Sequence, residues 1–186
     1  IMHIPKGWAT AGAPRPWTSR THILWVGSCR PVKQPWVLLT LARMFPKEQF
    51  VMVVPPYTGR RDELYNTVMR EARTIPNLEF IGHQLPIAEV DELFRGAKLY
   101  VMTSEWEGFS NTLLQAGAAA TPIASLSVNP DGYIDESGAG VVAEGSLPTL
   151  AAGISALLAD GGARAHQAGL SNWDYVKRNH SIDRAV

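Results

Sequence analysis

Short apolar runs alternate with longer amphipathic segments along this chain. The apolar runs hold three to five residues, and they predict strands at 22–26, 50–54, 78–81, 99–102, 123–125 and 140–143. The amphipathic segments predict helices at 34–45, 61–74, 87–95, 111–119, 147–158 and 164–178. Fully apolar strands that alternate with helices are typical of a parallel sheet covered on both faces. We therefore expect an α/β fold with a doubly wound parallel sheet of about six strands.

The first 21 residues differ from the rest of the chain. They are rich in proline and tryptophan and show no periodicity. We expect an irregular lead-in or an interdomain linker at 1–21, followed by one domain at 22–186. Within that domain, Trp25 lies in an apolar strand and should belong to the core. Residues 129–133, Asn-Pro-Asp-Gly-Tyr, predict a turn by composition.

Composition and charge exclude several classes of protein. The 186 residues carry a net charge of zero, which argues against a broad nucleic-acid-binding surface. No apolar run approaches the roughly 20 residues that span a bilayer, so we expect no membrane contact from this domain. The lone Cys29 excludes an intrachain disulfide and fits a reducing compartment. The scattered histidines show no metal-ligand spacing.

Three polar loops follow predicted strands and should meet at one edge of the sheet. They are residues 27–33, 82–85 and 104–112. In open α/β sheets, ligands bind outside the carboxyl ends of the strands, where the strand order reverses. The first loop carries Arg30 and Lys33, which would hold an anionic ligand there or, alternatively, would be solvated loop charges.

The ten residues that begin at Glu107, Glu-Gly-Phe-Ser-Asn-Thr-Leu-Leu-Gln-Ala, are the most informative of the chain. They follow the strand at 99–102 and open a helix whose N-cap is expected at Ser110 or Asn111. Unpaired N–H groups and the helix dipole attract phosphate there, and Gly108 lets the backbone approach closely. Glu107 can accept hydrogen bonds from sugar hydroxyls, although an exposed acid that complements the helix dipole is the alternative. The run therefore predicts a site for an anion joined to a polyol.

This run resembles the E-x7-E motif of glycosyltransferase family 4, with Glu107 at the first position and Gln115 at the second. That family comprises retaining, metal-independent sugar transferases with two facing Rossmann-like domains, the GT-B fold. The resemblance covers roughly residues 22–180. It implies the carboxyl-terminal, donor-binding half, with the amino-terminal acceptor-binding domain absent. It also implies no cofactor and no metal, because the nucleoside-diphosphate sugar is a substrate.

The resemblance assigns roles to individual residues. The family loop after the first strand follows roughly G-R-x-x-x-x-K-G, which places Lys33 at the family lysine and Ser28 at the family arginine. We expect Arg30, two residues later, to supply the missing charge. Glu107, Lys33 and Arg30 are then the predicted catalytic residues, which act on the sugar and the diphosphate. The predicted donor-binding residues are Gly27, Ser28, His83, Gly108, Phe109, Ser110, Asn111, Thr112 and Gln115.

Gln115 departs from the family pattern, in which a second glutamate binds the ribose diol. An amide oxygen accepts hydrogen bonds without charge. We therefore expect ribose binding to be weaker by about 1–2 kcal/mol, and Gln115→Glu to strengthen nucleotide binding. A helix-surface glutamine without ligand contact is the alternative.

For the whole parent protein, the resemblance implies a hexosyltransferase of the cytoplasm, with peripheral inner-membrane contact through the missing half. It would move a sugar from a nucleoside diphosphate, UDP or GDP, to a hydroxyl of a glycan, glycolipid or polysaccharide. The isolated chain should bind nucleotide and transfer little or nothing. Two alternatives stay open, an epimerase-like enzyme half and a non-catalytic nucleotide-sugar-binding module. A nicotinamide dehydrogenase is disfavoured, because residues 27–32 lack the G-x-G-x-x-G turn.

Overall fold

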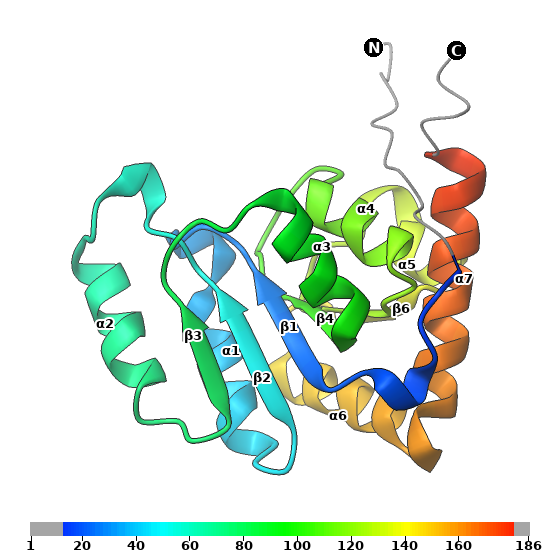
Figure 1. Cartoon of the computed structure of the whole chain (residues 1–186), viewed down its shortest axis with the longest axis horizontal. Coiled ribbons are helices and arrows are strands. Elements are labelled where there is room, and N and C mark those ends of the chain that lie inside the picture. Colours follow the sequence, from blue (N-terminus) through cyan, green and yellow to red (C-terminus); the bar gives the residue numbers. More distant parts are fainter. Residues whose placement is uncertain (1–12, 181–186) are drawn as a thin grey trace.

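The computed structural model describes residues 13–180 and contains one six-stranded parallel sheet (Figure 1). The strand order is β3-β2-β1-β4-β5-β6, so the direction of winding reverses between β1 and β4. This is the doubly wound, Rossmann-like arrangement that the sequence predicts. The strands are β1 His22–Val26, β2 Gln49–Val53, β3 Leu78–Ile81, β4 Ala97–Met102, β5 Ile123–Ser125 and β6 Gly140–Val142.

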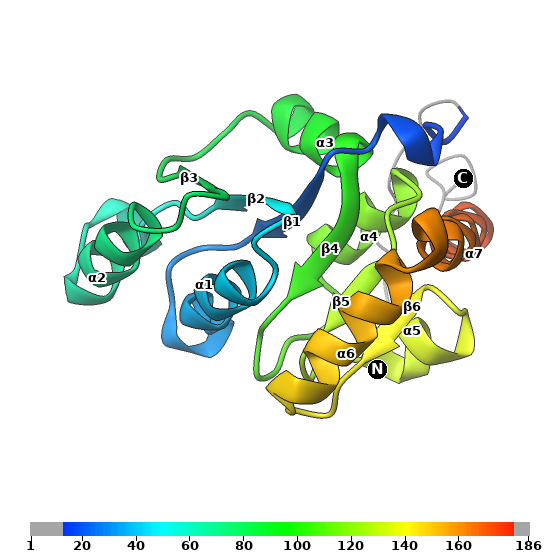
Figure 2. The ribbon, with the colours of Figure 1, turned by 90° about the horizontal axis from the view of Figure 1, so that it is seen from below.

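Helices cover both faces of the sheet (Figure 2). Residues of α1, α2 and α6 pack on one face, and residues of α3, α4 and α5 pack on the other. The last helix, α7, packs beside α4 and α6. The helices are α1 Pro35–Met44, α2 Glu63–Ala72, α3 Ile87–Gly96, α4 Asn111–Ala118, α5 Tyr133–Glu136, α6 Leu147–Leu158 and α7 Ala163–Asn179. None of the helices in the described part is long and apolar enough to cross a membrane.

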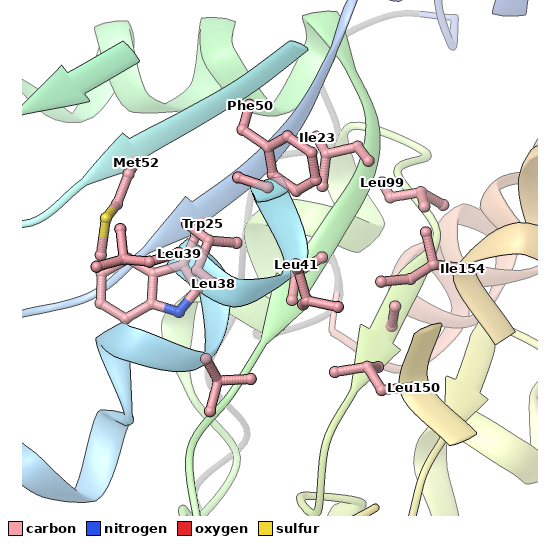
Figure 3. Packing of buried hydrophobic residues seen from close by; sticks show 14 of the residues in the cluster. Ile23, Trp25, Leu38, Leu39, Leu41, Phe50, Met52, Leu99, Leu150 and Ile154 are labelled. Carbon is pink, nitrogen blue, oxygen red and sulfur yellow. The ribbon is translucent and has the colours of Figure 1, made fainter. Parts of the chain in front are cut away.

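Alternating residues of each strand feed two separate apolar clusters. In β1, Ile23 and Trp25 join the cluster on the α1 side, whereas Leu24 joins the cluster on the α3 side. Figure 3 shows Trp25 among residues of α1 and of β2, including Met52. Trp25 is 2% exposed, which confirms its prediction as a core residue. Burial on both faces explains why the central strands β1, β2, β4 and β5 are mostly apolar.

The sequence predicts a turn at 129–133, and Pro130–Gly132 form a 3-10 turn there. The helix α5, which begins directly after this turn at Tyr133, was not predicted. Asn129 organises this segment, because its side-chain oxygen accepts a hydrogen bond from the backbone N–H of Ile134 at 2.8 Å. Turn-forming residues dominate the composition of this segment, and the helix that follows them is only four residues long. The composition therefore predicts the turn and not the helix.

The described part of the predicted lead-in lies against the domain. Residues 17–19 form a short 3-10 helix, and Arg20 is only 4% exposed. Its guanidinium donates hydrogen bonds to the backbone oxygens of Ala97 at 2.8 Å and Ala119 at 2.9 Å. Burial, and secondarily Arg15, lowers the pKa of Arg20 to about 10. Residues 1–12 of the lead-in lie outside the described residues, and the boundary at residue 21 stays a prediction.

Gly117 sets how closely α4 approaches α7. A Cβ atom at this position would lie 2.2 Å from Val176 Cγ2 and 2.9 Å from Asn172 Oδ1. We expect Gly117→Ala to lower the free energy of unfolding by about 1–3 kcal/mol, the usual cost of overpacking. Urea unfolding measures this loss, and Val176→Ala in the same chain should relieve part of it. The control is Gly108→Ala, because a Cβ there meets no atom within 4 Å. Equal stabilities of the two alanine variants would contradict this view of the α4–α7 contact.

Candidate functional site

The loops that follow β1 and β4 are joined at the point where the strand order reverses. The backbone N–H of Glu105 donates to the carbonyl of Val32 at 2.9 Å. The hydroxyl of Thr103 donates to the carbonyl of Lys33 at 2.5 Å and accepts from Trp25 Nε1 at 2.8 Å. Two of the three loops singled out from the sequence therefore converge, and the core residue Trp25 supports their junction.

Lys33 and Glu107, one from each loop, form an ion pair. Lys33 Nζ lies 2.5 Å from Glu107 Oε1, and the two side chains are 18% and 22% exposed. Ser104 donates to the second carboxylate oxygen of Glu107 at 3.2 Å. A cation and a carboxylate are thus held side by side on the rim of the sheet. Together they can bind phosphate and hydroxyl groups of one ligand.

The backbone after Lys33 is held in an uncommon conformation. Gln34 has φ 46° and ψ 55°, in the left-handed region that glycine adopts at no cost. The residue joins the 3-10 turn Pro31–Lys33 to α1, which begins at Pro35. In the family pattern, glycine follows the lysine at this place. The turn between Lys33 and α1 therefore holds a side chain in the left-handed region at position 34.

The N-terminus of α4 opens beside this ion pair. The sequence predicted the N-cap at Ser110 or Asn111, and Ser110 is the N-cap residue. Its side chain makes no capping hydrogen bond. Instead its hydroxyl lies 2.9 Å from the hydroxyl of Thr112, which accepts from Tyr100 at 2.9 Å. Among the described residues, no group accepts from the backbone N–H of Asn111 or Thr112. These N–H groups can therefore receive an anion.

Two residues of the motif take different positions. Gly108 is exposed, and the space where its side chain would lie is open. The ring of Phe109 packs against Tyr133 at 5.2 Å and His180 at 4.8 Å between centroids. Phe109 thus links the motif to α5 and to the end of α7. Its contact with a donor stays a prediction.

Arg30 does not join the Lys33–Glu107 pair. Its guanidinium lies over the ring of Tyr57, 4.7 Å from the centroid, in the loop that follows β2. The sequence offered no signal for this contact, because Tyr57 belongs to another strand end. Nearby, the Cys29 thiol is buried, and its burial, followed by the charge of Asp62, raises its pKa to about 11. The Cys29 side chain packs in the apolar cluster on the α1 side of the sheet.

The remaining residues predicted in the first and second loops, 27–33 and 82–85, are less tightly placed. A Cβ at Gly27 would lie 2.9 Å from the Trp25 ring, so packing alone accounts for this glycine. Ser28 is partly exposed and makes no side-chain hydrogen bond within residues 13–180. His83 follows β3, two strands away from β1, and lines a groove of about 420 Å³ with Arg61 and Tyr65. The structure does not bring His83 into contact with Lys33 or Glu107.

Gln115 has a partner that the sequence did not reveal. It is 7% exposed, and its Nε2 donates to Asp91 Oδ1 of α3 at 2.8 Å. Asp91 lies in the acidic run Glu-Val-Asp-Glu at 89–92, which has the pattern of a solvated helix face. A glutamate at position 115 would face this carboxylate. The structure therefore predicts that Gln115→Glu would bring two carboxylates together, a cost that the sequence alone did not reveal.

One protein family matches the part of the chain that contains the paired loops. A family profile described as "Glycosyl transferases group 1" matches residues 20–160, which is most of the chain. The chain belongs to this family. The match begins just before β1 and includes both Lys33 and Glu107, so the paired loops of this glycosyl transferase domain lie within it. Among curated protein sequences, none matched the chain.

Solved structures show the same fold. Sucrose-phosphate synthase from Thermosynechococcus elongatus superposes with a TM-score of 0.77 and 20% identity, over 98% of this chain and 49% of that one. A TarM variant from S. aureus, solved with UDP, gives 0.78 and 16%, over 96% and 36%. The C-terminal domain of LpcC from Francisella tularensis gives 0.73 and 19%, over 87% of each chain. This glycosyl transferase domain therefore has the fold of one GT-B half, and it spans less than half of the two longer proteins.

Proposed function

We propose that this chain is the donor-binding half of a retaining glycosyltransferase of family 4. The parent protein would transfer a sugar from a nucleoside diphosphate to a hydroxyl of a glycan, glycolipid or polysaccharide. One observation carries the proposal: the Lys33–Glu107 pair lies at the reversal of strand order, beside the open N-terminus of α4. The match to glycosyl transferases supports transfer over the epimerase-like alternative.

The chemistry follows from the charges at the rim. Lys33 and the N–H groups of Asn111 and Thr112 would hold the diphosphate, and Glu107 would accept from hydroxyls of the sugar. As the bond from sugar carbon to phosphate oxygen breaks, negative charge gathers on the diphosphate, and a fixed cation lowers the barrier. The acceptor hydroxyl forms the new bond on the same face, and its proton passes to the leaving phosphate. We propose that no metal and no cofactor take part.

Lys33 and Glu107 form an ion pair, and we propose that donor binding separates them. The diphosphate replaces Glu107 as the partner of Lys33, and the sugar hydroxyls replace Lys33 as the partner of Glu107. Arg30 would reach the same phosphates by leaving the Tyr57 ring. This exchange of partners couples recognition of the phosphate to recognition of the sugar.

The proposal assigns the acceptor to a second, amino-terminal domain. A Rossmann-like half that spans 36–49% of its longer structural neighbours supports this division. The isolated chain should therefore bind a donor nucleotide without measurable transfer. The cytoplasmic location expected from the sequence remains part of this proposal.

Nucleotide binding is tested by thermal unfolding of the chain with UDP, GDP, ADP and their sugar conjugates at millimolar concentration. A ligand at a hundredfold excess over its Kd should stabilise the chain by about 2.7 kcal/mol. UDP is the first choice, because the TarM variant was solved with it. The nucleosides without phosphate serve as controls and should not shift the transition. Equal stabilisation by a nucleoside and its diphosphate would contradict the assignment of the phosphate site.

A further inference from the structure

A groove of about 420 Å³ lies between α2 and β3, at the end of the sheet that β3 forms (Figure 2). Apolar side chains of both elements line it, among them Met69 of α2 and Leu78 and Phe80 of β3. Arg61, which precedes α2, and Arg73, which directly follows it, also line the groove. Among the described residues, no carboxylate does so. We call this feature the α2–β3 groove.

The two arginines of the groove carry charges that nothing nearby neutralises. Both side chains are exposed, and within residues 13–180 neither forms an ion pair. The guanidinium of Arg61 lies over the ring of Tyr65, 5.7 Å from its centroid, which keeps it at the groove. The chain as a whole has no net charge. Two unpaired cations in one groove are therefore a local feature that favours an acidic partner.

The strand beside the groove has an open edge. Within residues 13–180, β3 pairs only with β2. The carbonyls of Asn77 and Ile81 accept from the backbone N–H groups of Phe50 and Val54, at 2.8 and 2.9 Å. Successive residues of a strand direct their backbone groups to opposite sides, so the N–H and C=O of Phe80 point away from β2. An added strand could pair with this edge.

The spacing of the arginines decides what kind of ligand reaches both. The ten residues of α2 separate them, so their backbones lie about 15–18 Å apart at the rise of an α-helix. A compact anion such as phosphate would contact only one of them. An extended peptide of seven residues spans about 20 Å, and its first and last side chains point to the same face. Acidic residues at its two ends would thus meet both arginines.

We propose that the α2–β3 groove binds an extended peptide with acidic side chains at both ends, which adds to the sheet as a strand beside β3. Its backbone pairs with Phe80, and its inward apolar side chains pack against Phe80 and Met69. Its two acids pair with Arg61 and Arg73. This inference goes beyond the proposed donor site and does not depend on it, because none of these four residues is assigned to that site.

Exposed arginines also attract any polyanion, by a binding that depends on charge and salt alone. Strand addition makes two demands that such attraction does not. It requires apolar side chains on alternate residues of the peptide, and it uses the N–H of only every second residue. These two demands define the experiment.

The probe is the heptapeptide Glu-Thr-Val-Thr-Val-Thr-Glu with blocked ends, whose Kd is measured by calorimetry at one salt concentration. Its acids and valines share one face. The matched control, Glu-Val-Thr-Thr-Thr-Val-Glu, has the same composition and the same terminal acids but directs its valines to the opposite face. We expect the control to bind at least about tenfold more weakly, because its valines stay in water.

Backbone methylation tests the pairing itself. Two further peptides carry one N-methyl group each, on the third or on the fourth residue of the probe. Neighbouring N–H groups of a strand point to opposite sides, so only one of the two methyl groups removes a bond to β3. One methylated peptide should bind about tenfold more weakly than the probe, and the other should stay within about threefold of it.

Substitutions in the chain locate the site. Arg61→Ala and Arg73→Ala should each weaken binding of the probe by about three- to fivefold, as expected for exposed ion pairs. Arg70→Ala is the matched control, because Arg70 is an exposed arginine of α2 that does not line the groove. It should leave the Kd unchanged. Thermal unfolding of the three variants checks that each of them is folded.

Four outcomes would overturn the inference. They are equal binding of the probe and its rearranged control, equal effects of the two methyl groups, equal effects of Arg70→Ala and the two groove variants, and no saturable binding of the probe to the unsubstituted chain. Each leaves the proposed donor site untouched. Conversely, a chain that binds the probe but no nucleotide would contradict the proposed function and support the groove.

Discussion

Replacing Lys33 by alanine should weaken the binding of a nucleoside diphosphate by about 10- to 100-fold. The lost interaction is a charge-assisted hydrogen bond, worth about 1.5–3 kcal/mol, and each 1.4 kcal/mol is about a factor of ten. The loss has a second source. Glu107, which Lys33 neutralises at 2.5 Å, would remain unpaired beside the phosphates and repel them.

Glu107→Gln should affect two ligands in opposite directions. It removes the partner of Lys33, so the lysine meets the diphosphate without first breaking an ion pair. Bare diphosphate should bind equally well or a few times more tightly. The sugar conjugate should bind more weakly, because the carboxylate that accepts from its hydroxyls is gone. A variant with both substitutions should bind the bare diphosphate better than Lys33→Ala alone.

Calorimetry at a fixed salt concentration measures these constants, since exposed charges are screened by salt. Lys47→Ala is the matched control, because Lys47 is an exposed lysine in the turn between α1 and β2. It should leave every constant unchanged. Loss of affinity in Lys47→Ala equal to that in Lys33→Ala would show a general effect of net charge. Equal weakening of both ligands by Glu107→Gln would remove Glu107 from the sugar site.

Most of the fold could be predicted because its central strands are buried on both faces and read as apolar runs. The bounds of β1, β3, β5 and α6 agree with prediction, and the other predicted elements differ by no more than two residues at either end. The observed helix ends differ from the predicted ones where contacts with neighbouring elements, rather than the periodicity of the sequence, decide where a helix ends. The region near α5 was missed because Asn129 starts a single helical turn inside a segment with turn composition.

The site was predictable only where one element determines it. Lys33 and Glu107 each lie in a loop that follows a strand, and the strand order then places the two loops together. Arg30 is different, because its long side chain packs over the ring of Tyr57, which lies in the loop after another strand. The partner of Gln115 depends on how α3 packs beside α4, and no local pattern encodes that packing. Residue types were enough to nominate the site residues. Their contacts could not be predicted, because they depend on side-chain direction and on which helices pack together.

Trp25→Ala should destabilise the chain by about 3–5 kcal/mol, the usual cost of deleting a large buried aromatic side chain. The indole fills the core on the α1 side of the sheet (Figure 3) and is 2% exposed. Its Nε1 also donates to Thr103, whose hydroxyl donates to the carbonyl of Lys33. Deletion therefore leaves a cavity and removes one donor from the junction of the two rim loops.

Trp25→Phe separates these two losses. It keeps most of the apolar volume but removes the N–H, so it should cost less, about 1–2 kcal/mol, for the missing hydrogen bond and a small void. Thr103 still donates to Lys33 in this variant, so the loop should keep its position. The matched control is Trp36→Ala, because Trp36 is 42% exposed at the start of α1. Its cost should stay below about 1 kcal/mol, as for surface substitutions.

Unfolding in urea gives the three free energies, with the slope of each transition as a check on two-state behaviour. The expected order of loss is Trp25→Ala, then Trp25→Phe, then Trp36→Ala. If Trp25→Phe costs as much as Trp25→Ala, the hydrogen bond to Thr103 outweighs the packing of the ring. If Trp36→Ala costs as much as Trp25→Ala, burial in this face of the sheet does not govern the stability of the domain. The position of the loops after β1 and β4 would then depend on contacts other than those of Trp25.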